Sequence, residues 1–482
     1  MQLFNNTTTI LPQKKKNQFN MSKPSIPQGT RDFNAEVVRK RQYIFNTIRN
    51  VFALYGFEPL ETPAMENLDT LIGKYGEEGD KLMFKILNNG ISNPKNIEKS
   101  KAGFEKVLLG KSSSDLTERA LKYDLTIPFA RFVAMNHGKL TFPYRRYQIQ
   151  PVWRGDSPQK GRYREFTQCD ADVVGSQSLN NEVELACIYH EVFSQLNIEG
   201  YRLCINSRKI LAALAQVCEA EDQTIAITTA IDKLDKIGIA KVQEELASKG
   251  LNEKQIAKVT SYLTLDKPDT LVETSNRERL DFLKQFFAQN ETGLAGIQEL
   301  ETVVFHPQST ANFVIDPTLA RGLNYYTGII FEAKAPASVS IGSIGGGGRY
   351  DDLTGLFDVP GIPGVGISFG VDRIYDVLTE LALFPSDVQT GTQVLFFNMG
   401  ANESLFAFGI MQQLRSKGIR CELYHEAHKI GKQFGFAEKK NIPFAVIIGS
   451  KEMEQQYALV KNLATGIQEV VVFEKLSQYF NN

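Results

Sequence analysis

The apolar residues near the start of the chain recur at the spacing of an α-helix. Between Glu36 and Tyr55 they form one stripe, made of Val37, Ile44, Ile48, Val51 and Tyr55. A period of 3.6 residues predicts an amphipathic helix with one buried face, which Gly56 ends. A short extended segment, 57–62, then runs into Pro63. Residues 88–115 are rich in Asn, Ser, Lys and Gly, and this composition predicts a surface insertion or a long loop.

Two long segments change this rhythm. From about Lys209 to Leu300 the pattern is helical throughout and highly charged, which predicts a helical insertion between two parts of a strand-rich domain. After Pro385 strands and helices alternate, which predicts a small α/β domain with a mainly parallel sheet. We expect its strands over 394–397, 420–424 and 444–448, and its helices over 403–417 and near 429–439.

The segment 144–174, YRRYQIQPVWRGDSPQKGRYREFTQCDADVV, has polar residues at alternate positions of two predicted strands. Alternate side chains of a strand share a face. An ordinary solvated hairpin would also have one polar face. Because the opposite face is apolar, a strand inside a sheet is favoured, with its polar side covered by a pocket or a ligand. On the first strand this face holds Arg146, Gln148, Gln150 and Arg154. On the second it holds Arg164, Gln168, Asp170 and Asp172, with Phe166 at the same parity.

The formal net charge of -1 excludes a protein whose whole surface attracts nucleic acid, so any such contact must come from a local patch. One candidate patch lies between Lys139 and Arg164, where Asp156 is the one acid. A solvated charged loop has the same composition, but such a patch also attracts phosphate. Its basic residues are Lys139, Arg145, Arg146, Arg154, Lys160, Arg162 and Arg164.

Two further segments place cations beside predicted strand ends. In LARGLNYYTGIIFEA, Arg321 comes just before Tyr325 and Tyr326 at the mouth of an apolar strand. In GIPGVGISFGVDRIYDVL, a Gly-rich strand ends at Gly370 and a helix begins, with Arg373 in its first turn. The helix dipole disfavours a cation there, so a ligand phosphate or a stacked base is expected beside it.

Other features narrow the class of protein. The run 345–348, four glycines, lacks the Lys-Ser/Thr of a P-loop and predicts a tight turn with close backbone approach. The five cysteines are scattered without a C-x-x-C pair, which indicates reduced thiols and gives no metal framework. No apolar run approaches the roughly 20 residues that span a bilayer. The first 31 residues lack Asp, Glu and the apolar stretch of a secretory signal, so a disordered polar leader is expected, with a transit peptide as the alternative.

The segments 144–174, 319–333 and 361–378, together with IPQGTRDF at 26–33 and LKYDLTIPFARF at 121–132, closely resemble class II histidyl-tRNA synthetases. The resemblance covers about Lys23 to Phe480. It includes KNLATGIQEVV at 461–471, which looks like the anticodon-binding domain of that family.

The resemblance implies an α+β fold, in which an antiparallel catalytic sheet of six or seven strands is interrupted by a helical insertion and followed by an α/β anticodon-binding domain. Helix 36–55 and the strand that runs into Pro63 resemble the family's first motif, which forms a dimer interface, so a homodimer is expected. The expected divisions are a leader at 1–22, a catalytic domain in two parts at 23–208 and 301–385, an insertion domain at 209–300 and an anticodon-binding domain at 386–482.

The resemblance also implies an activity. The enzyme would activate L-histidine with ATP, release pyrophosphate and transfer histidine to the 3′ end of tRNA(His), with Mg²⁺ accompanying ATP, in the cytoplasm. Arg154 and Arg321 would be the catalytic residues, since both would bind the α-phosphate and contact the histidine carboxylate. Phe166 and Arg373 would enclose the adenine, and Arg162 would also contact ATP.

The histidine site that the resemblance implies has two ends. The α-ammonium would be held by Asp124, Leu125 and Thr126, with help from Gln168. The imidazole would be held by Asp172 and Tyr326, beside Tyr325. None of the five histidines of the chain falls at these positions.

One position departs from the family: Asn324 stands where members usually carry Asp, so a role based on charge at that position is in doubt. The loop 155–161 varies within the family, and Gln159 is a weak candidate for reading the first base pair of the tRNA. A regulatory paralogue of histidine biosynthesis is one alternative, but it lacks the anticodon-binding domain. A synthetase for threonine, proline or glycine is another, although the run Arg-Gly-Leu-Asn-Tyr-Tyr belongs to the histidine branch.

Overall fold

The computed structural model describes residues 23–264, 272–320, 325–389 and 391–481, so the leader predicted for 1–22 lies outside the described residues. At the centre is an eight-stranded sheet in the order β1-β5-β6-β11-β10-β9-β7-β8. The six central strands pair antiparallel, as expected, and the edge strands β1 and β8 add two parallel pairings. The strands are β1 (Glu58–Pro59), β5 (Tyr144–Trp153), β6 (Glu165–Val174), β7 (Arg202–Ser207), β8 (Phe313–Ile315), β9 (Ile329–Lys334), β10 (Ser343–Tyr350) and β11 (Gly364–Gly370).

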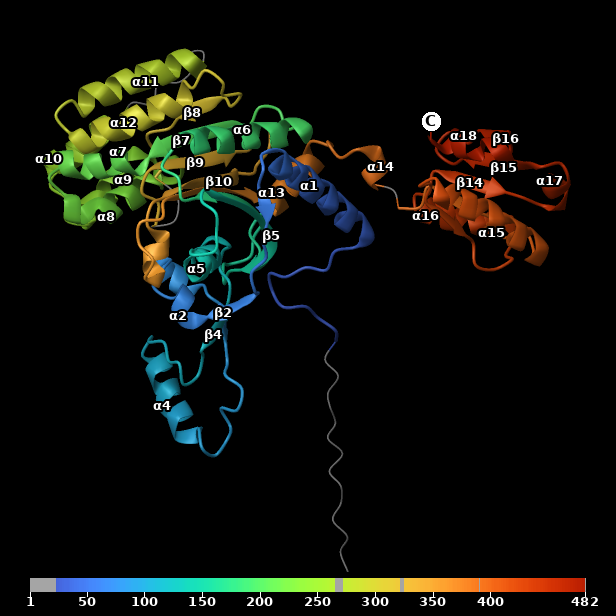
Figure 1. Ribbon diagram of the computed structural model, residues 1–482, viewed down its shortest axis with the longest axis horizontal. Coiled ribbons are helices and arrows are strands. Elements are labelled where there is room, and N and C mark those ends of the chain that lie inside the picture. Colours follow the sequence, from blue (N-terminus) through green and yellow to red (C-terminus); the bar gives the residue numbers. More distant parts are fainter. Residues whose placement is uncertain (1–22, 265–271, 321–324, 390, 482) are drawn as a thin grey trace, which may run out of the picture.

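Three helices, α1 (Ala35–Leu54), α6 (Asn180–Gln195) and α13 (Val371–Glu380), cover one face of this sheet (Figure 1). The Asn34 side chain caps α1 by accepting a hydrogen bond from the Val37 N–H at 3.0 Å. Ile44, Ile48 and Val51 are fully buried in the main core, as the apolar stripe predicts. The predicted helix 36–55 is therefore confirmed to within one residue at each end.

The opposite face carries α5 (Thr126–Asn136) and a three-stranded sheet in the order β2-β4-β3. Phe129 and Val133 of α5 share a hydrophobic core with Val174 and Tyr350 of the large sheet. This packing fixes the start of α5 over the polar sides of β5 and β6. The small elements here are β2 (Met65–Asn67), α2 (Leu68–Leu71), α3 (Gly76–Lys81), β3 (Lys85–Ile86) and β4 (Arg119–Leu121).

One prediction about local structure was incomplete and one was wrong. The region 88–115, expected as a surface insertion or long loop, is an insertion between β3 and β4 that contains the helix α4 (Ile97–Leu108) and projects from the small sheet (Figure 1). The Asn, Ser, Lys and Gly of this region favoured a loop, and only Gly103 of the helix is buried. The four glycines 345–348 form no turn; they lie within β10, between β9 and β11. The other part of that prediction, close approach of the backbone, is confirmed, because these glycines lie between the backbones of β9 and β11.

The insertion between β7 and β8 is helical throughout the part that the structure describes, as predicted. It packs one long hydrophobic core continuous with that of the large sheet. Its elements are α7 (Arg208–Val217), η1 (Glu221–Gln223), α8 (Thr224–Ile231), α9 (Leu234–Ser248), α10 (Glu253–Leu263), α11 (Val272–Phe286) and α12 (Glu291–Val304).

After η2 (Leu353–Phe357) and α13, the short α14 (Ser386–Gln389) leads to a five-stranded sheet in the order β13-β12-β14-β15-β16 with cores of its own. All five predicted elements are present. The sheet is only half parallel, because β15 and β16 form an antiparallel hairpin that the pattern did not predict. The elements are β12 (Val394–Phe396), α15 (Ala401–Ser416), β13 (Cys421–Leu423), α16 (Ile430–Lys439), β14 (Phe444–Ile447), α17 (Ser450–Glu454), β15 (Tyr457–Asn462), β16 (Gln468–Val472), η3 (Phe473–Lys475) and α18 (Leu476–Asn481).

Two further expectations concern the whole chain. All five cysteines are buried and free, as their scattered positions predict. Within the described residues, none of the helices has the length and apolar character needed to cross a bilayer.

Candidate active site

A pocket lies on the polar side of the large sheet, where β5, β6, β10 and β11 meet the start of α5. Arg146 and Gln148 on the polar parity of β5 are fully buried, so this face is not that of a solvated hairpin. The structure brings seven of the predicted substrate-binding residues together around this pocket. They are Asp124, Thr126, Arg154, Gln168, Asp172, Tyr325 and Tyr326.

Asp124 is held in one orientation by three donors. Its Oδ1 accepts hydrogen bonds from the Tyr75 hydroxyl at 2.8 Å and the Ile127 N–H at 3.1 Å. Its Oδ2 accepts one from the Tyr325 hydroxyl at 3.4 Å. Burial raises the pKa of Asp124, and the bonds from Ile127 and Tyr75 oppose that rise. The next residue, Leu125, is fully buried, and its carbonyl oxygen accepts from Arg146 Nη2 at 3.4 Å.

Asp172 forms a buried ion pair with Arg146, with 2.8 Å between Oδ2 and Nη2. The Tyr350 hydroxyl donates to the other carboxylate oxygen at 2.6 Å. Burial raises the pKa of Asp172, whereas Arg146 and Tyr350 lower it. The Arg146 guanidinium also lies over the Phe129 ring, 4.2 Å from its centroid. Because an unpaired buried charge costs several kcal/mol, this pairing is what allows Asp172 to stay ionised.

Glycines make the space for these side chains. A Cβ on Gly366 would lie 2.0 Å from Asp172 Oδ1, and one on Gly348 would lie 3.0 Å from Cδ1 of Tyr326. Gly346 and Gly347 also line the pocket. The glycines of β10 and β11 therefore leave space in the pocket between the side chains that these strands do contribute, Tyr350 and Ser368.

Arg154 is positioned by contacts on several sides. Its Nε donates to the Tyr123 carbonyl oxygen at 3.0 Å, and its Nη2 lies 3.5 Å from the Gln168 Oε1. The guanidinium lies 4.4 Å from the Tyr123 ring centroid and 5.1 Å from that of Phe166. These contacts place a fixed positive charge at the pocket before any ligand arrives.

The loop 155–164 connects β5 to β6 and is held from outside. The Gly155 N–H donates to the Leu82 carbonyl at 2.7 Å, and Arg373 Nε donates to the Gly161 carbonyl at 3.1 Å. Arg373 Nη1 also donates to the Ser343 carbonyl at 2.6 Å. These carbonyl oxygens compensate for a cation at a helix start, so a ligand is not required to explain Arg373.

Three residues predicted to contact ATP, Arg162, Phe166 and Arg373, lie outside the pocket lining. Arg162 is exposed, and the structure does not bring it to the pocket lining. Phe166 is partly exposed at the start of β6, beside Arg154. Arg321 and Asn324 fall outside the described residues.

Residues 27–33, here called the N-terminal strap, pack against the same loop. The Arg164 N–H donates to the Gly29 carbonyl at 2.8 Å. The Arg31 guanidinium lies 3.2 Å from the centroid of the Tyr163 ring, and its Nη2 pairs with Asp372 Oδ1 at 2.7 Å. Gly29 has a φ of +82°, and a Cβ there would lie 2.7 Å from the Arg164 Cγ. The strap therefore links the loop to the start of α13.

The prediction left out several residues of the pocket. Asp170 shares the parity of Gln168 and Asp172 and lines the pocket, so the alternation already pointed to it. Tyr350 and Ser368 also line it, and no spacing in the sequence indicated their contribution. Ser368 lies on β11, which pairs with β6, and Tyr350 on the next strand, β10; both strands are far from β6 in the sequence, which a local pattern does not reveal.

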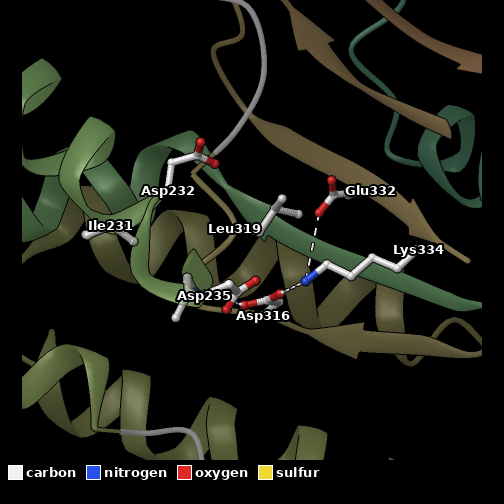
Figure 2. Close-up of a pocket in the computed structure, with 8 residues that line it drawn as sticks. Ile231, Asp232, Asp235, Asp316, Leu319, Glu332 and Lys334 are labelled. Carbon is white, nitrogen blue, oxygen red and sulfur yellow. Dashed lines mark hydrogen bonds and ion pairs between the residues drawn. The ribbon is translucent and has the colours of Figure 1, made fainter. Parts of the chain in front are cut away.

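A second pocket lies between the helical insertion and the large sheet (Figure 2). Asp232 and Asp235 come from the insertion, and Asp316 follows β8. Lys334 Nζ lies 3.1 Å from Asp316 Oδ2 and 3.9 Å from Glu332 Oε2. Lys334 balances one of the four acidic side chains that line this pocket, and we assign the pocket no ligand.

Comparison with known proteins gives the same family over the whole chain. Residues 113–374 match the family described as Histidyl-tRNA synthetase, and residues 393–482 match the Anticodon binding domain. A histidine–tRNA ligase of Bacteroides fragilis is 51% identical over 94% of this chain and 98% of its own length. One of Flavobacterium johnsoniae is 48% identical over 95% and 99%.

A solved structure supports the same conclusion. The histidyl-tRNA synthetase from Nostoc sp. PCC 7120 superposes with a TM-score of 0.78 at 34% identity, covering 95% of this chain and 98% of that one. The fold class predicted from the sequence is thereby confirmed. With half of its residues shared with these relatives along nearly its full length, the chain belongs to the histidyl-tRNA synthetase family.

Proposed function

We propose that the protein charges tRNA(His) with histidine in two steps. An oxygen of the histidine carboxylate attacks the α-phosphorus of ATP, which forms histidyl-adenylate and releases pyrophosphate. A hydroxyl of the 3′-terminal ribose of the tRNA then attacks the carbonyl carbon, and AMP leaves. Family membership supports this reaction. The observation that carries it to this chain is the pocket in which the Arg154 guanidinium meets Asp124, Gln168 and Asp172.

Arg154 and Arg321 are proposed to bind the α-phosphate and the histidine carboxylate. Negative charge builds on the phosphate oxygens as the pentacoordinate centre forms. A cation that is already oriented stabilises this charge without reorganising, so it lowers the barrier more than it tightens substrate binding. The bond from Arg154 to the Tyr123 carbonyl and its position over two rings support this role.

Asp124 is proposed to bind the α-ammonium of histidine, with the Thr126 hydroxyl and Gln168 beside it. Its carboxylate already accepts hydrogen bonds from Tyr75, Ile127 and Tyr325, which fix its orientation. Leu125 contributes through the backbone at the start of α5. Among the described residues Asp124 forms no ion pair, although Arg154 acts on it from across the pocket, and the substrate ammonium is proposed to supply the paired cation.

Asp172 and Tyr326 are proposed to hydrogen-bond the imidazole, with Tyr325 packed beside them. The Arg146 ion pair keeps Asp172 ionised and therefore able to accept from a ring N–H. An apolar amino acid of similar size would leave these buried groups without partners. The enzyme should therefore discriminate against such amino acids by several orders of magnitude in kcat/KM.

The adenine is proposed to bind near Phe166 and Arg373, at the loop 155–164. The Arg373 side chain is aligned by the Ser343 and Gly161 carbonyls, and this order supports a stacking role. The exposed Arg162 is proposed to reach the outer phosphates of ATP.

Mg²⁺ is proposed to arrive with ATP. Among the described residues, no three His, Cys, Asp or Glu side chains converge in a metal-binding arrangement. Mg²⁺ usually keeps water ligands and binds through phosphates and one or two carboxylates. We therefore propose that the phosphates carry the ion, with at most one carboxylate of the protein.

The remaining proposals concern the whole chain. Residues 386–482 are proposed to bind the tRNA anticodon, 209–300 to form the insertion domain, and 23–208 with 301–385 the catalytic domain. The enzyme is proposed to act in the cytoplasm as a homodimer through α1 and the strand that follows it. Sedimentation of the active enzyme as a stable monomer would contradict the dimer.

Pyrophosphate exchange, measured separately with each of the twenty amino acids, tests the proposed function. Histidine alone should support rapid exchange of label between pyrophosphate and ATP. Exchange with another amino acid but not with histidine would refute the proposal. Charging of a tRNA(His) transcript then tests the second step.

A further inference from the structure

Asp170 lies at the centre of the pocket but has no part in the functions proposed so far. On β6 it lies opposite Gln148 of β5 and Ser368 of β11. Its side chain is 3% exposed and lines the pocket with Asp172 and Tyr326. Its Oδ1 is buried and has no hydrogen-bond partner among the described residues. An unpartnered buried oxygen is costly, so a donor from a ligand is the natural partner.

Among the described residues, Asp170 has no ion pair of its own. The guanidinium of Arg146 on β5 influences it but is already paired with Asp172. Arg154 lies beside Gln168. Lys122 and Asp124 also influence Asp170, and the buried Arg208 influences Tyr326. The other titratable groups here are the phenols Tyr189 of α6, Tyr326 and Tyr350. Asp170 is therefore a buried carboxylate without a paired cation where the imidazole is proposed to bind.

We propose that Asp170 is a further specificity residue of the histidine site, whose Oδ1 accepts a hydrogen bond from a ring N–H, so that the imidazole binds in its doubly protonated, cationic form. This inference rests on the proposed function. Asp172 is proposed to accept from one ring N–H beside its contacts with the Tyr350 hydroxyl and Arg146, so the second ring N–H needs another acceptor. A cationic ring between Asp170, Asp172 and Tyr326 gives Asp170 the paired cation that it lacks among the described residues.

The proton balance follows from the same geometry. Burial raises the pKa of Asp170 to about 7, with Asp172 adding to the rise and Arg146 opposing it. Near neutral pH the empty site therefore holds a proton on Asp170 in part of the molecules, and on binding that proton passes to the ring. At pH 8 both Asp170 and the free imidazole, whose pKa is about 6.5, are largely unprotonated. Binding then takes one proton from solvent.

Titration calorimetry of histidine binding, in paired buffers of different ionisation enthalpy, measures this proton. The wild-type enzyme should take up close to one proton per site at pH 8. The uptake should vanish between about pH 6.5 and 7 and become a release at pH 6, where both free groups are protonated. No uptake by the wild-type enzyme at pH 8 would overturn the inference without any variant.

Asp170→Asn keeps the shape of the side chain but lacks the charge. Histidine affinity should fall at least tenfold, and the uptake at pH 8 should drop to what the α-amino group alone contributes. Affinity for ATP should change less than twofold, which shows that the fold is kept. A matched control is Glu66→Gln, a buried carboxylate that pairs with Arg131 outside the pocket, and it should leave the proton uptake unchanged.

A weakly basic analogue separates recognition of the cation from a structural role. In 1,2,4-triazolylalanine the ring has the shape and N–H of imidazole but accepts a second proton far less readily. The preference of the wild-type enzyme for histidine over this analogue should shrink at least tenfold in Asp170→Asn. An unchanged preference, or unchanged proton uptake, refutes the role of Asp170. Absence of any histidine-dependent pyrophosphate exchange by the wild-type enzyme would instead refute the proposed function.

Discussion

Gly366 illustrates how a residue without a side chain shapes the proposed histidine site. It lies on β11 opposite Asp172 of β6, and a Cβ at this position would lie 2.0 Å from Asp172 Oδ1. That oxygen accepts the hydrogen bond from the Tyr350 hydroxyl. A methyl group at Gly366 would therefore push the carboxylate away from Tyr350 and from the position in which it pairs with Arg146.

Gly366→Ala should raise the KM for histidine at least tenfold in pyrophosphate exchange. Overpacking of this kind typically costs about 1–3 kcal/mol, and here the cost falls on Asp172. The KM for ATP should change less than threefold, because the adenine side is not touched. Gly342→Ala is the control, since a Cβ there meets nothing within 4 Å. Equal losses for both substrates would show that the change acts on the fold instead.

The ion pair between Asp316 and Lys334 should give the second pocket a pH-dependent share in stability. Burial alone would raise the pKa of Asp316, but Lys334 and Thr318 more than offset it, so the pKa lies below its ordinary value. Burial by itself would lower the pKa of Lys334. The nearby Asp316 raises it by more, so the net shift is upward. The stabilisation by Asp316 is thus present above about pH 4 and lost below it, and that by Lys334 is lost above about pH 10.

Asp316→Asn should therefore lower the melting temperature at pH 7, and the difference from the wild-type protein should shrink as the pH falls below 4. Thermal melts followed by circular dichroism at pH 7 and pH 3.5 measure this. Asp281→Asn, at an exposed position of α11, should show no such dependence. A deficit of equal size at both pH values would mean that the lost contact is not electrostatic.

Much of the candidate site could be predicted from the sequence. Strand parity indicates a shared polar face for Arg154 and Asp172, the family resemblance adds Asp124, and the structure brings all three around one pocket. Their roles stay predictions. Arg146 is different: its alternation put it on the polar face, but its pairing with Asp172 depends on the register of β5 and β6. A sequence pattern does not give that register.

At the scale of elements, the N-terminal strap and the loop 155–164 depend on each other. The loop has few contacts with its own residues and is held by Leu82, by Arg373 and by the strap. The Arg31 guanidinium makes two of the strap's contacts, one with the Tyr163 ring and one with Asp372. Because Arg154 and Phe166 flank this loop, its position should affect the proposed ATP site.

Arg31→Gln should raise the KM for ATP about tenfold, since the stacking and the partly exposed ion pair together contribute on the order of 1–2 kcal/mol. Histidine affinity, measured without ATP, should change less than twofold. Arg31→Lys keeps the charge that pairs with Asp372 but loses the planar stack, so it should recover only part of the loss. Arg202→Gln, exposed on β7, is the control. A loss shared equally by both ligands would contradict this role for the strap.

Elements were predicted where their periodicity is strong and missed where it is not required. The helix α1 buries a clear stripe and was found to within one residue. β10 consists largely of glycine and shows no hydrophobic period. The helix α4 has apolar residues at helical spacing but leaves them exposed, within a segment whose Asn, Ser, Lys and Gly favour a loop. The hairpin of β15 and β16 has an exposed outer strand, and its pairing depends on contacts that no single segment reveals.

At the scale of the whole molecule, the two large sheets have separate hydrophobic cores. The first family match ends at 374 and the second begins at 393, so the boundary between the matches lies between the last strand of the first sheet and the first strand of the second. The short α14 belongs with the first body, since Arg39 Nε of α1 donates to the Val388 carbonyl at 3.2 Å. A truncation that ends at Gly391 therefore keeps α14 and removes the second sheet.

Such a truncation should keep histidine-dependent pyrophosphate exchange within threefold of the full chain but reduce charging of tRNA(His) at least a hundredfold. The pocket and the strap remain, whereas the proposed anticodon-binding domain is lost. Pyrophosphate exchange and tRNA charging, both measured on a preparation shown to have the native oligomeric state, test this prediction. If both activities fell by the same factor, the proposed division of work between the two parts would be wrong.

The contact between the strap and α13 can form only late in synthesis of the chain. Arg31 leaves the ribosome 341 residues before its partner Asp372. At about 5–20 residues per second, this interval lasts roughly 17–70 seconds. During that time Arg31 has no partner on α13, so the strap cannot link the loop 155–164, beside the proposed nucleotide site, to that helix. Eight of the fourteen residues that line the pocket, from Tyr325 to Ser368, are synthesised near the end of the same interval, so the pocket and the anchor of the strap are completed together.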